Sequence, residues 1–157
     1  MGGDRELASA YDEVLANARA YDKSANIEGV LVQEMVGDGI EAILGVTNDP
    51  LFGPAVMFGL GGIFAEVLKD VSFRLAPVTP AVARDMVEEI TAYPVLAGAR
   101  GRPRADVDAL VDAIARLSAL AVDLKDRVAE LDINPLFVFA EGKGVKAADA
   151  LIKLRGP

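Results

Sequence analysis

The sequence predicts an α+β fold, in which one mostly antiparallel sheet is covered by packed helices. Three observations support this prediction. Amphipathic patterns of helical period occur in three parts of the chain, short apolar segments of strand type lie between them, and tight turns rich in Gly, Pro, Asn and Asp join the strand segments. Short turns between neighbouring strands favour antiparallel pairing. With 157 residues, 52% of them hydrophobic, the chain has enough material for a buried core.

The first half of the chain contains one helix and a series of strands. Apolar residues recur at spacings of three and four over 5–22, which predicts an amphipathic helix. Turn residues then separate five segments that are typical of strands, at about 30–36, 41–48, 54–58, 64–69 and 72–76. Together these segments indicate an antiparallel meander.

The second half contains two helices and a hairpin. Thr79 followed by Pro80 is typical of a helix start, because the hydroxyl caps the first turn and Pro fits the first helical position. The longest helix is expected over about 105–127, with one apolar side. The remaining residues predict a β-hairpin, formed by 128–139, a turn at 141–144 and a returning strand at 145–154.

Composition and charge exclude several classes of function. The 16 Lys and Arg against 24 Asp and Glu give a net charge of −8, which is unfavourable for binding a nucleic-acid backbone. No apolar run reaches the ~20 residues of a membrane span, and no signal peptide is visible, so we expect no membrane. The absence of Cys fits a reducing compartment, and we expect the cytoplasm. The absence of His excludes a phosphohistidine made on this chain.

The segment 130–136 contains two candidate metal ligands. Side chains alternate along a strand, so Asp132 and Asn134 point the same way while the residues between and before them face the core. Two oxygen-bearing side chains at this spacing suit Mg²⁺. The alternative is that the pair only solvates the outer face of the sheet. Pro135 cannot donate a ladder hydrogen bond, which indicates a strand edge, a bulge or a bend.

The hairpin brings a third candidate ligand to this pair. If the turn is centred between Gly142 and Lys143, Leu151 lies opposite Asn134. Asp149 then shares a face with Asn134, one diagonal step away at roughly 7 Å between Cα atoms. A loop of two or four residues gives this face, whereas a loop of three residues would turn Asp149 to the other face.

Four sequence blocks, in order, carry a family resemblance: 29–36 (GVLVQEMV), 49–54 (DPLFGP), 59–71 (GLGGIFAEVLKDV) and 130–136 (ELDINPL). The series resembles the ATP-grasp region of NDP-forming acyl-CoA synthetases, the β-subunit type of ADP-forming acetate–CoA ligase, and also related lysine acyltransferases. It covers about 25–154. The expected fold is accordingly the C-terminal lobe of an ATP-grasp fold.

The resemblance implies that Mg²⁺ and ATP or ADP bind to this chain. Asn134 and Asp149 would bind the Mg²⁺ of the nucleotide, and Asp132 would be a further ligand or lie next to the ligands. The resemblance also implies nucleotide contacts along adenine and ribose and near the phosphates, from Gln33, Glu34, Met35, Glu41, Gly61 and Gly62. The alternatives are an exposed strand end at 33–35, a solvated strand residue at 41 and a plain turn at 61–62.

The resemblance further implies that other parts are needed. Residues 25–157 match the C-terminal lobe, whereas 1–24 would be the end of a preceding lobe or a leading segment. The ATP-grasp N-terminal lobe, with its phosphate-binding Lys, is expected elsewhere, as are CoA-binding and phosphohistidine-bearing domains or subunits. We therefore assign no catalytic residue to this chain alone.

The implied reaction converts acyl-CoA, ADP and phosphate into acid, CoA and ATP through a phosphohistidine that another domain or subunit supplies. This chain would be the nucleotide- and Mg²⁺-binding part of that ligase, inactive by itself. The alternatives are a non-catalytic regulatory or docking module of an acyl-CoA synthetase-like lysine acyltransferase, and a plain assembly surface.

Overall fold

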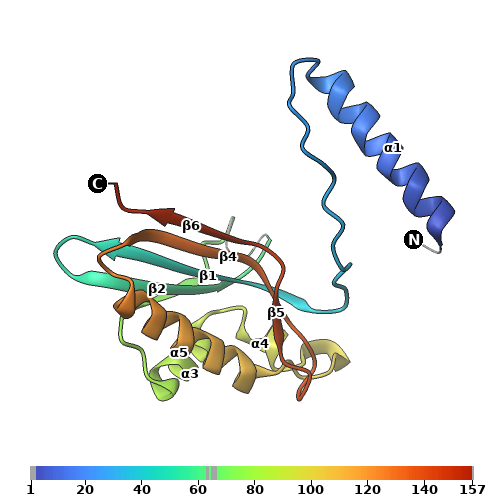
Figure 1. Cartoon of the computed structure of the whole chain (residues 1–157). Coiled ribbons are helices and arrows are strands. Elements are labelled where there is room, and N and C mark those ends of the chain that lie inside the picture. Colours follow the sequence, from blue (N-terminus) through green and yellow to red (C-terminus); the bar gives the residue numbers. More distant parts are fainter. Residues whose placement is uncertain (1–2, 63, 65–66, 157) are drawn as a thin grey trace. The chain divides into compact units, whose positions relative to one another are not determined.

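The protein is represented by a computed structural model that describes residues 3–62, 64 and 67–156, without the side chain of Arg100. It forms two compact units, Met1–Met35 and Val36–Pro157, and each is described by itself. The first unit contains helix α1 (Asp4–Tyr21), which confirms the helix expected over 5–22 (Figure 1). Its following segment is extended.

The strand expected over 30–36 is not formed. These residues belong to no strand in the described part of the chain, and Leu31 and Val32 are exposed. The apolar composition of the segment favours an extended backbone, but a strand also needs a neighbour that accepts and donates ladder hydrogen bonds. The prediction of a strand at these residues was therefore wrong.

The second unit is built on one antiparallel sheet (Figure 1). Six strands of the described residues form it, in the order β3-β2-β1-β4-β5, with β6 also paired to β4. Their bounds are β1 (Ile40–Asp49), β2 (Gly53–Leu60), β3 (Val71–Leu75), β4 (Val128–Val138), β5 (Val145–Ala147) and β6 (Ala150–Leu154). The helical elements are α3 (Pro80–Glu89), α4 (Tyr93–Leu96), the 3₁₀ turn η1 (Ala99–Gly101) and α5 (Val107–Asp123). The predicted α+β class is confirmed.

Several element boundaries differ from the predictions. The strand expected over 64–69 is not formed at the described residues: 64 is helical, 67 lies in a turn, 68 in a bend and 69 in no element, while 65 and 66 lie outside the described residues. The helix expected to be the longest, α5, has 17 residues against 18 in α1. The returning strand is divided into β5 and β6 at 148–149, although both parts pair with β4.

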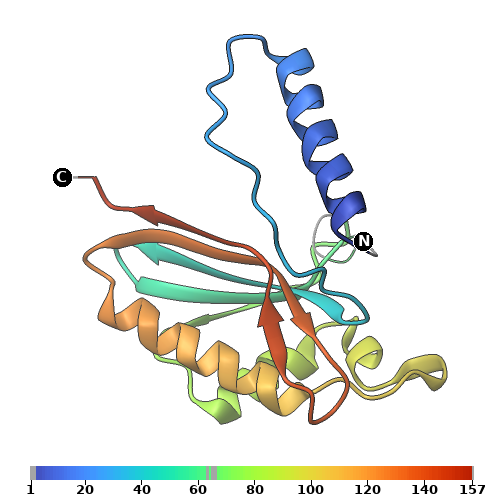
Figure 2. The ribbon, with the colours of Figure 1, turned by 45° about the vertical axis from the view of Figure 1, so that its right-hand side comes forward.

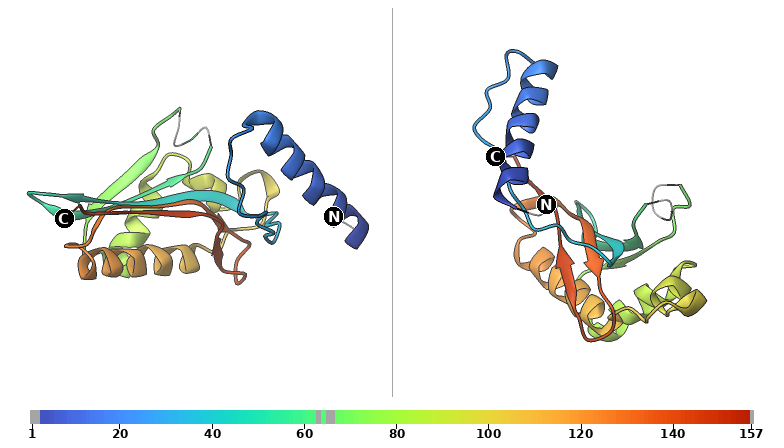
Figure 3. Two further views of the ribbon diagram at one scale, coloured as in Figure 1. Left: turned by 45° about the horizontal axis from the view of Figure 1, so that its top comes forward. Right: turned by 90° about the vertical axis from the view of Figure 1, so that its right-hand side faces the viewer.

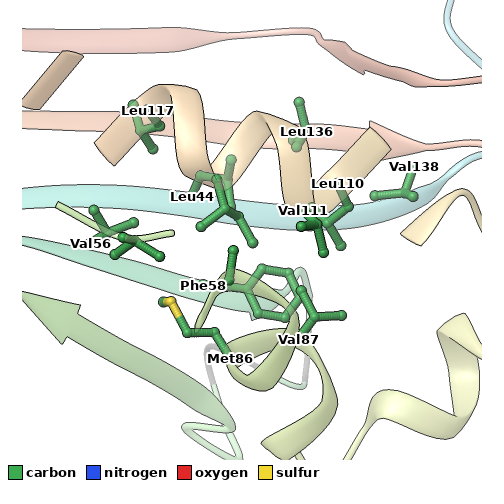
Figure 4. Close-up of a cluster of buried hydrophobic side chains, with 14 of the residues drawn as sticks. Leu44, Val56, Phe58, Met86, Val87, Leu110, Val111, Leu117, Leu136 and Val138 are labelled. Atoms are coloured by element: carbon green, nitrogen blue, oxygen red, sulfur yellow. The ribbon is translucent and has the colours of Figure 1, made fainter. Parts of the chain in front are cut away.

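The core lies between one face of the sheet and helices α3 and α5 (Figure 3). Side chains alternate along β1 and β2, so Leu44, Val56 and Phe58 point toward the helices and are almost completely buried. Helix α3 begins where it was predicted, because Thr79 Oγ1 accepts a hydrogen bond from the Val82 N–H at 3.3 Å. Figure 4 shows the two helices contributing Met86 and Leu110 to the same cluster. None of the described helices is both long and apolar enough to cross a membrane.

Ser118 makes a buried polar contact between α5 and the chain that follows β3. Its fully buried Oγ accepts a hydrogen bond from the Val78 N–H at 2.6 Å. We expect Ser118→Ala to lower the free energy of unfolding by about 1–3 kcal/mol, because the Val78 N–H would remain buried without an acceptor. Urea unfolding measures this change. Ser72→Ala is the control, since the buried Ser72 hydroxyl has no partner among the described residues, and equal losses in both variants would contradict the explanation.

Candidate metal and nucleotide site

The sheet face that points away from α3 and α5 carries most of the residues that were predicted to bind ligands. We call it the open face and define it by Glu41, Gly45, Met57 and Asp132. Cross-strand pairing places Gly45 between Met57 of β2 and Asp132 of β4. Phe73 and Leu151 extend this row on β3 and β6, and the row lines a shallow hollow of about 290 Å³.

A β-bulge lies in β4, the strand that carries two of the predicted metal ligands. Ala42 pairs with Leu136 and Leu44 with Ile133, so Asn134 and Pro135 together face the single residue between those partners on β1. Pro has no N–H for the ladder, which explains why the extra residue sits here. The expected irregularity at Pro135 is thus confirmed. Asp132 is half-buried and Asn134 is exposed.

The hairpin register differs from the one predicted, but it keeps Asp149 beside Asn134. Asp132 pairs with Leu151, which is two residues from the expected partner. The Asn134 N–H donates to the Asp149 carbonyl oxygen at 3.2 Å, so these two residues lie directly opposite each other rather than diagonally. The loop closes at Phe139 and Gly144, so its centre lies between Glu141 and Gly142, one residue earlier in the chain than assumed. A shift of two residues leaves the face of a side chain unchanged.

The donor atoms at this point of the open face suit a hard cation. Asp149 is exposed and its Oδ1 accepts a hydrogen bond from the Ala150 N–H at 2.8 Å, which orders the carboxylate. Nowhere in the described part of the chain do three or more Asp, Glu, His or Cys side chains gather as a metal site. The predicted donors are two carboxylates and one amide, from Asp132, Asn134 and Asp149, and Mg²⁺ commonly completes its ligands with water and phosphate oxygens.

Glu41 lies directly beside the glycine turn at the end of β2. The Gly61 N–H donates to the Glu41 carbonyl oxygen at 2.8 Å, which extends the β1–β2 ladder by one pair. A Cβ at Gly61 would lie only 3.1 Å from the Glu41 Cβ, and Gly62 adopts a left-handed φ of +64°. Both positions therefore favour glycine. The structure thus brings together three of the residues that were predicted to lie near the phosphates.

Two further glycines lie on the open face of the sheet: Gly59 belongs to the resemblance block 59–71, whereas Gly45 was not singled out from the sequence. A Cβ at Gly45 would lie 3.2 Å from the Met57 Cε, and a Cβ at Gly59 would lie 2.8 Å from a Val71 methyl carbon. Both glycines are buried, because the Met57 and Val71 side chains already lie where a Cβ at Gly45 or Gly59 would point. Glycine inside a strand often marks close approach of a ligand or of another backbone. The signal available in the sequence was a glycine inside an apolar strand segment.

Two basic side chains near these strands are already paired. Arg74 of β3 donates to both carboxylate oxygens of Glu89, at 2.8 and 2.6 Å, and this contact raises the pKa of the arginine. Lys153 lies 3.1 Å from the Glu130 carboxylate at the edge of the hollow. The charges of these two cations are therefore already balanced by carboxylates of the same chain.

The predicted adenine and ribose contacts lie in the other unit. Gln33, Glu34 and Met35 are exposed residues of the extended segment that ends the unit Met1–Met35. They belong to no described strand, and their roles remain predictions.

The chain belongs to the ATP-grasp family, whose domain model matches residues 1–154. Within this family it is similar to ADP-forming acid–CoA ligases. It is 52% identical, over 151 residues, to the β subunit of ADP-forming acetate–CoA ligase II from Pyrococcus furiosus, covering 96% of this chain and 64% of that subunit. The chain therefore spans just under two thirds of that relative.

Solved structures of a related enzyme show the same fold. Dinucleotide-forming acetyl-coenzyme A synthetase 1 from Ca. Korarchaeum cryptofilum, with coenzyme A, acetyl-coenzyme A and a phosphorylated phosphohistidine segment, superimposes with a TM-score of 0.90 at 42% identity, covering 99% of this chain and 68% of that chain. A second structure of it holds coenzyme A and Mg-AMPPCP, with the phosphohistidine segment pointing towards the nucleotide binding site. It matches with a TM-score of 0.84 at 40% identity, over 98% of this chain and 65% of that chain.

Proposed function

We propose that this chain is the nucleotide- and Mg²⁺-binding part of an ADP-forming acyl-CoA synthetase. The observation that carries the proposal is the pairing of Asn134 with Asp149 across neighbouring segments of the sheet, two residues along β4 from Asp132. These oxygen-bearing side chains suit a hard cation such as Mg²⁺, and the Gly61 and Gly62 amides follow β2 in the same sheet. The similarity to acetate–CoA ligases, and the nucleotide analogue bound in a related structure, support the same assignment.

Each residue has a distinct role in this proposal. Asn134 and Asp149 hold Mg²⁺, and Asp132 is a further ligand or binds a water of the cation. The phosphates lie near Glu41 and the main-chain amides of Gly61 and Gly62. Adenine and ribose lie along Gln33, Glu34 and Met35.

The proposed reaction converts acyl-CoA, ADP and phosphate into acid, CoA and ATP in the cytoplasm, where these substrates occur. In its last step the nitrogen–phosphorus bond of a phosphohistidine breaks, and a β-phosphate oxygen of ADP forms the new bond to phosphorus. Such transfer depends mainly on in-line positioning and on stabilising phosphate charge. Bound Mg²⁺ supplies that charge stabilisation. The chain has no His, so the phosphohistidine comes from another domain or subunit.

The proposed partners are an ATP-grasp N-terminal lobe and CoA-binding and phosphohistidine-bearing domains or subunits. A regulatory module of a lysine acyltransferase is not favoured, because the similar proteins described above are ligases and synthetases.

Calorimetric titration of Mg–ADP and Mg–ATP into the full-length protein tests the proposal. We expect binding that weakens tenfold or more when EDTA removes Mg²⁺, and a comparable loss in Asn134→Ala. Asn134→Asp, which keeps an oxygen donor at the same position, should retain more affinity than Asn134→Ala. No binding to the wild-type protein, or equal binding to wild type and Asn134→Ala, would contradict the proposal.

A further inference from the structure

Asp106 connects the start of α5 to the tip of the β4–β5 hairpin. Its Oδ1 accepts a hydrogen bond from the Ala109 N–H at 3.1 Å, and its Oδ2 accepts one from the Gly144 N–H at 2.8 Å. Its own N–H donates to the Phe139 carbonyl oxygen at 2.8 Å. Only 9% of Asp106 is exposed, so both carboxylate oxygens are satisfied inside the protein. Figure 2 shows the hairpin turn beside the first turn of α5.

The residues just before Asp106 hold the same loop. The Glu141 N–H donates to the Arg104 carbonyl oxygen at 2.9 Å, and Ala105 forms an isolated β-bridge with Ala140. The segment 104–106 therefore contacts the loop near its start and at its end. These contacts fix a loop of four residues, 140–143, between the closing pair of Phe139 and Gly144.

The length of this loop determines which face Asp149 occupies. With four residues in the loop, the pairing continues along β5 and β6 until Asp149 lies opposite Asn134. A slip of one residue would turn every side chain of the returning strand to the other face.

The β6 part of the returning strand does little to specify this register. All residues of β6 are exposed. Leu151 on the open face and Ile152 on the other face are 71% and 51% exposed, so apolar side chains occupy both faces. Register is weakly specified where neither face of a strand is clearly buried. The information must therefore come from Val145 of β5, which packs against the core, and from the turn, where Asp106 makes a side-chain contact.

We infer that Asp106 is a positioning residue, which fixes the hairpin register that places Asp149 opposite Asn134. The hydrogen bonds from the Gly144 and Ala109 N–H groups hold the pKa of Asp106 below its ordinary value, so the acceptor stays charged at neutral pH. The role of this register in metal binding rests on the proposed function, whereas the register itself is measured without a metal.

NMR on the full chain tests the inference with Asp106→Ala and Asp106→Asn. Asn retains the ability to cap α5 but loses the charged acceptor for Gly144. In the wild type we expect a cross-strand contact between Asp132 and Leu151. Both variants should lose or shift this contact, and their Asn134 amide should exchange with solvent at least tenfold faster. Thr79→Ala is the matched control, since it removes the cap of α3 without touching the hairpin. An unchanged contact and unchanged exchange in both Asp106 variants would overturn the inference.

A second measurement separates this inference from the proposed function. Mn²⁺, used alone as a probe, should broaden the Asn134 side-chain resonances in the wild type and in Thr79→Ala. At least tenfold more Mn²⁺ should be needed in Asp106→Ala. Equal Mn²⁺ binding together with an unchanged register would overturn the inference. A changed register in the variant, with no Mn²⁺ bound by the wild type, would support the inference and contradict the proposed metal site.

Discussion

Asp132→Ala and Asn134→Ala are each expected to lower the rate of ATP formation by the full-length protein at least 100-fold. Asp132 and Asn134 are two of the three residues proposed to hold the cation, directly or through a bound water. Loss of either leaves the cation with water in place of a positioned ligand, so the phosphate chain is held less firmly. Removing even a group that orients a metal ligand commonly costs tenfold to a hundredfold in affinity or activity. The measurement is ATP production from acyl-CoA, ADP and phosphate at saturating Mg²⁺.

Asp123→Ala is the control for these two variants. Asp123 is an exposed carboxylate at the end of α5, the helix that packs against the opposite face of the sheet. It removes the same charge as Asp132→Ala, so a general effect of net charge would appear in both. Activity of Asp132→Ala and Asn134→Ala within a few-fold of the control would contradict the assignment of the open face.

Phe58→Ala is expected to have the largest effect on stability, a loss of about 3–5 kcal/mol in the free energy of unfolding. Phe58 is completely buried and is the largest of the fully buried side chains in the described structure. Figure 4 shows it close to Met86 and Val87 of α3, so its removal leaves a cavity between the sheet and that helix. Urea unfolding with the slope held common to all variants measures the loss.

Phe52→Ala provides a matched control for Phe58→Ala. Phe52 lies in the turn between β1 and β2 and is 71% exposed. The same atoms are removed from a solvated position, so the free energy of unfolding should change by no more than about 0.5 kcal/mol. Similar losses in the two variants would show that the core is not arranged as described.

The elements that could be predicted from the sequence are those specified by local chemistry. The Thr79 hydroxyl and the Pro that follows it define a helix start without reference to the rest of the chain. The missing N–H of Pro135 likewise indicated an irregular strand at that position, which the bulge in β4 confirms. The strand expected over 30–36 shows the limit of this reasoning, because composition determines an extended conformation but not the presence of a paired neighbour.

The candidate site shows the same division between local and tertiary information. Asp132 and Asn134 were found from their spacing and from the family resemblance. The predicted pairing partner of Asp149 was wrong by two residues, because the turn is held by Asp106 and Arg104, which are distant in sequence. Gly45 was missed, since its importance appears only when the pairing places it between Met57 and Asp132.

A crystal structure of the full-length protein with Mg²⁺ and a non-hydrolysable ATP analogue tests the central claim most directly. We expect a cation at about 2.0–2.1 Å from the Asn134 side-chain oxygen and from a carboxylate oxygen of Asp149. The phosphates should lie over the open face beside Gly61. A nucleotide bound on another surface, or a cation held by neither of these two residues, would contradict the account.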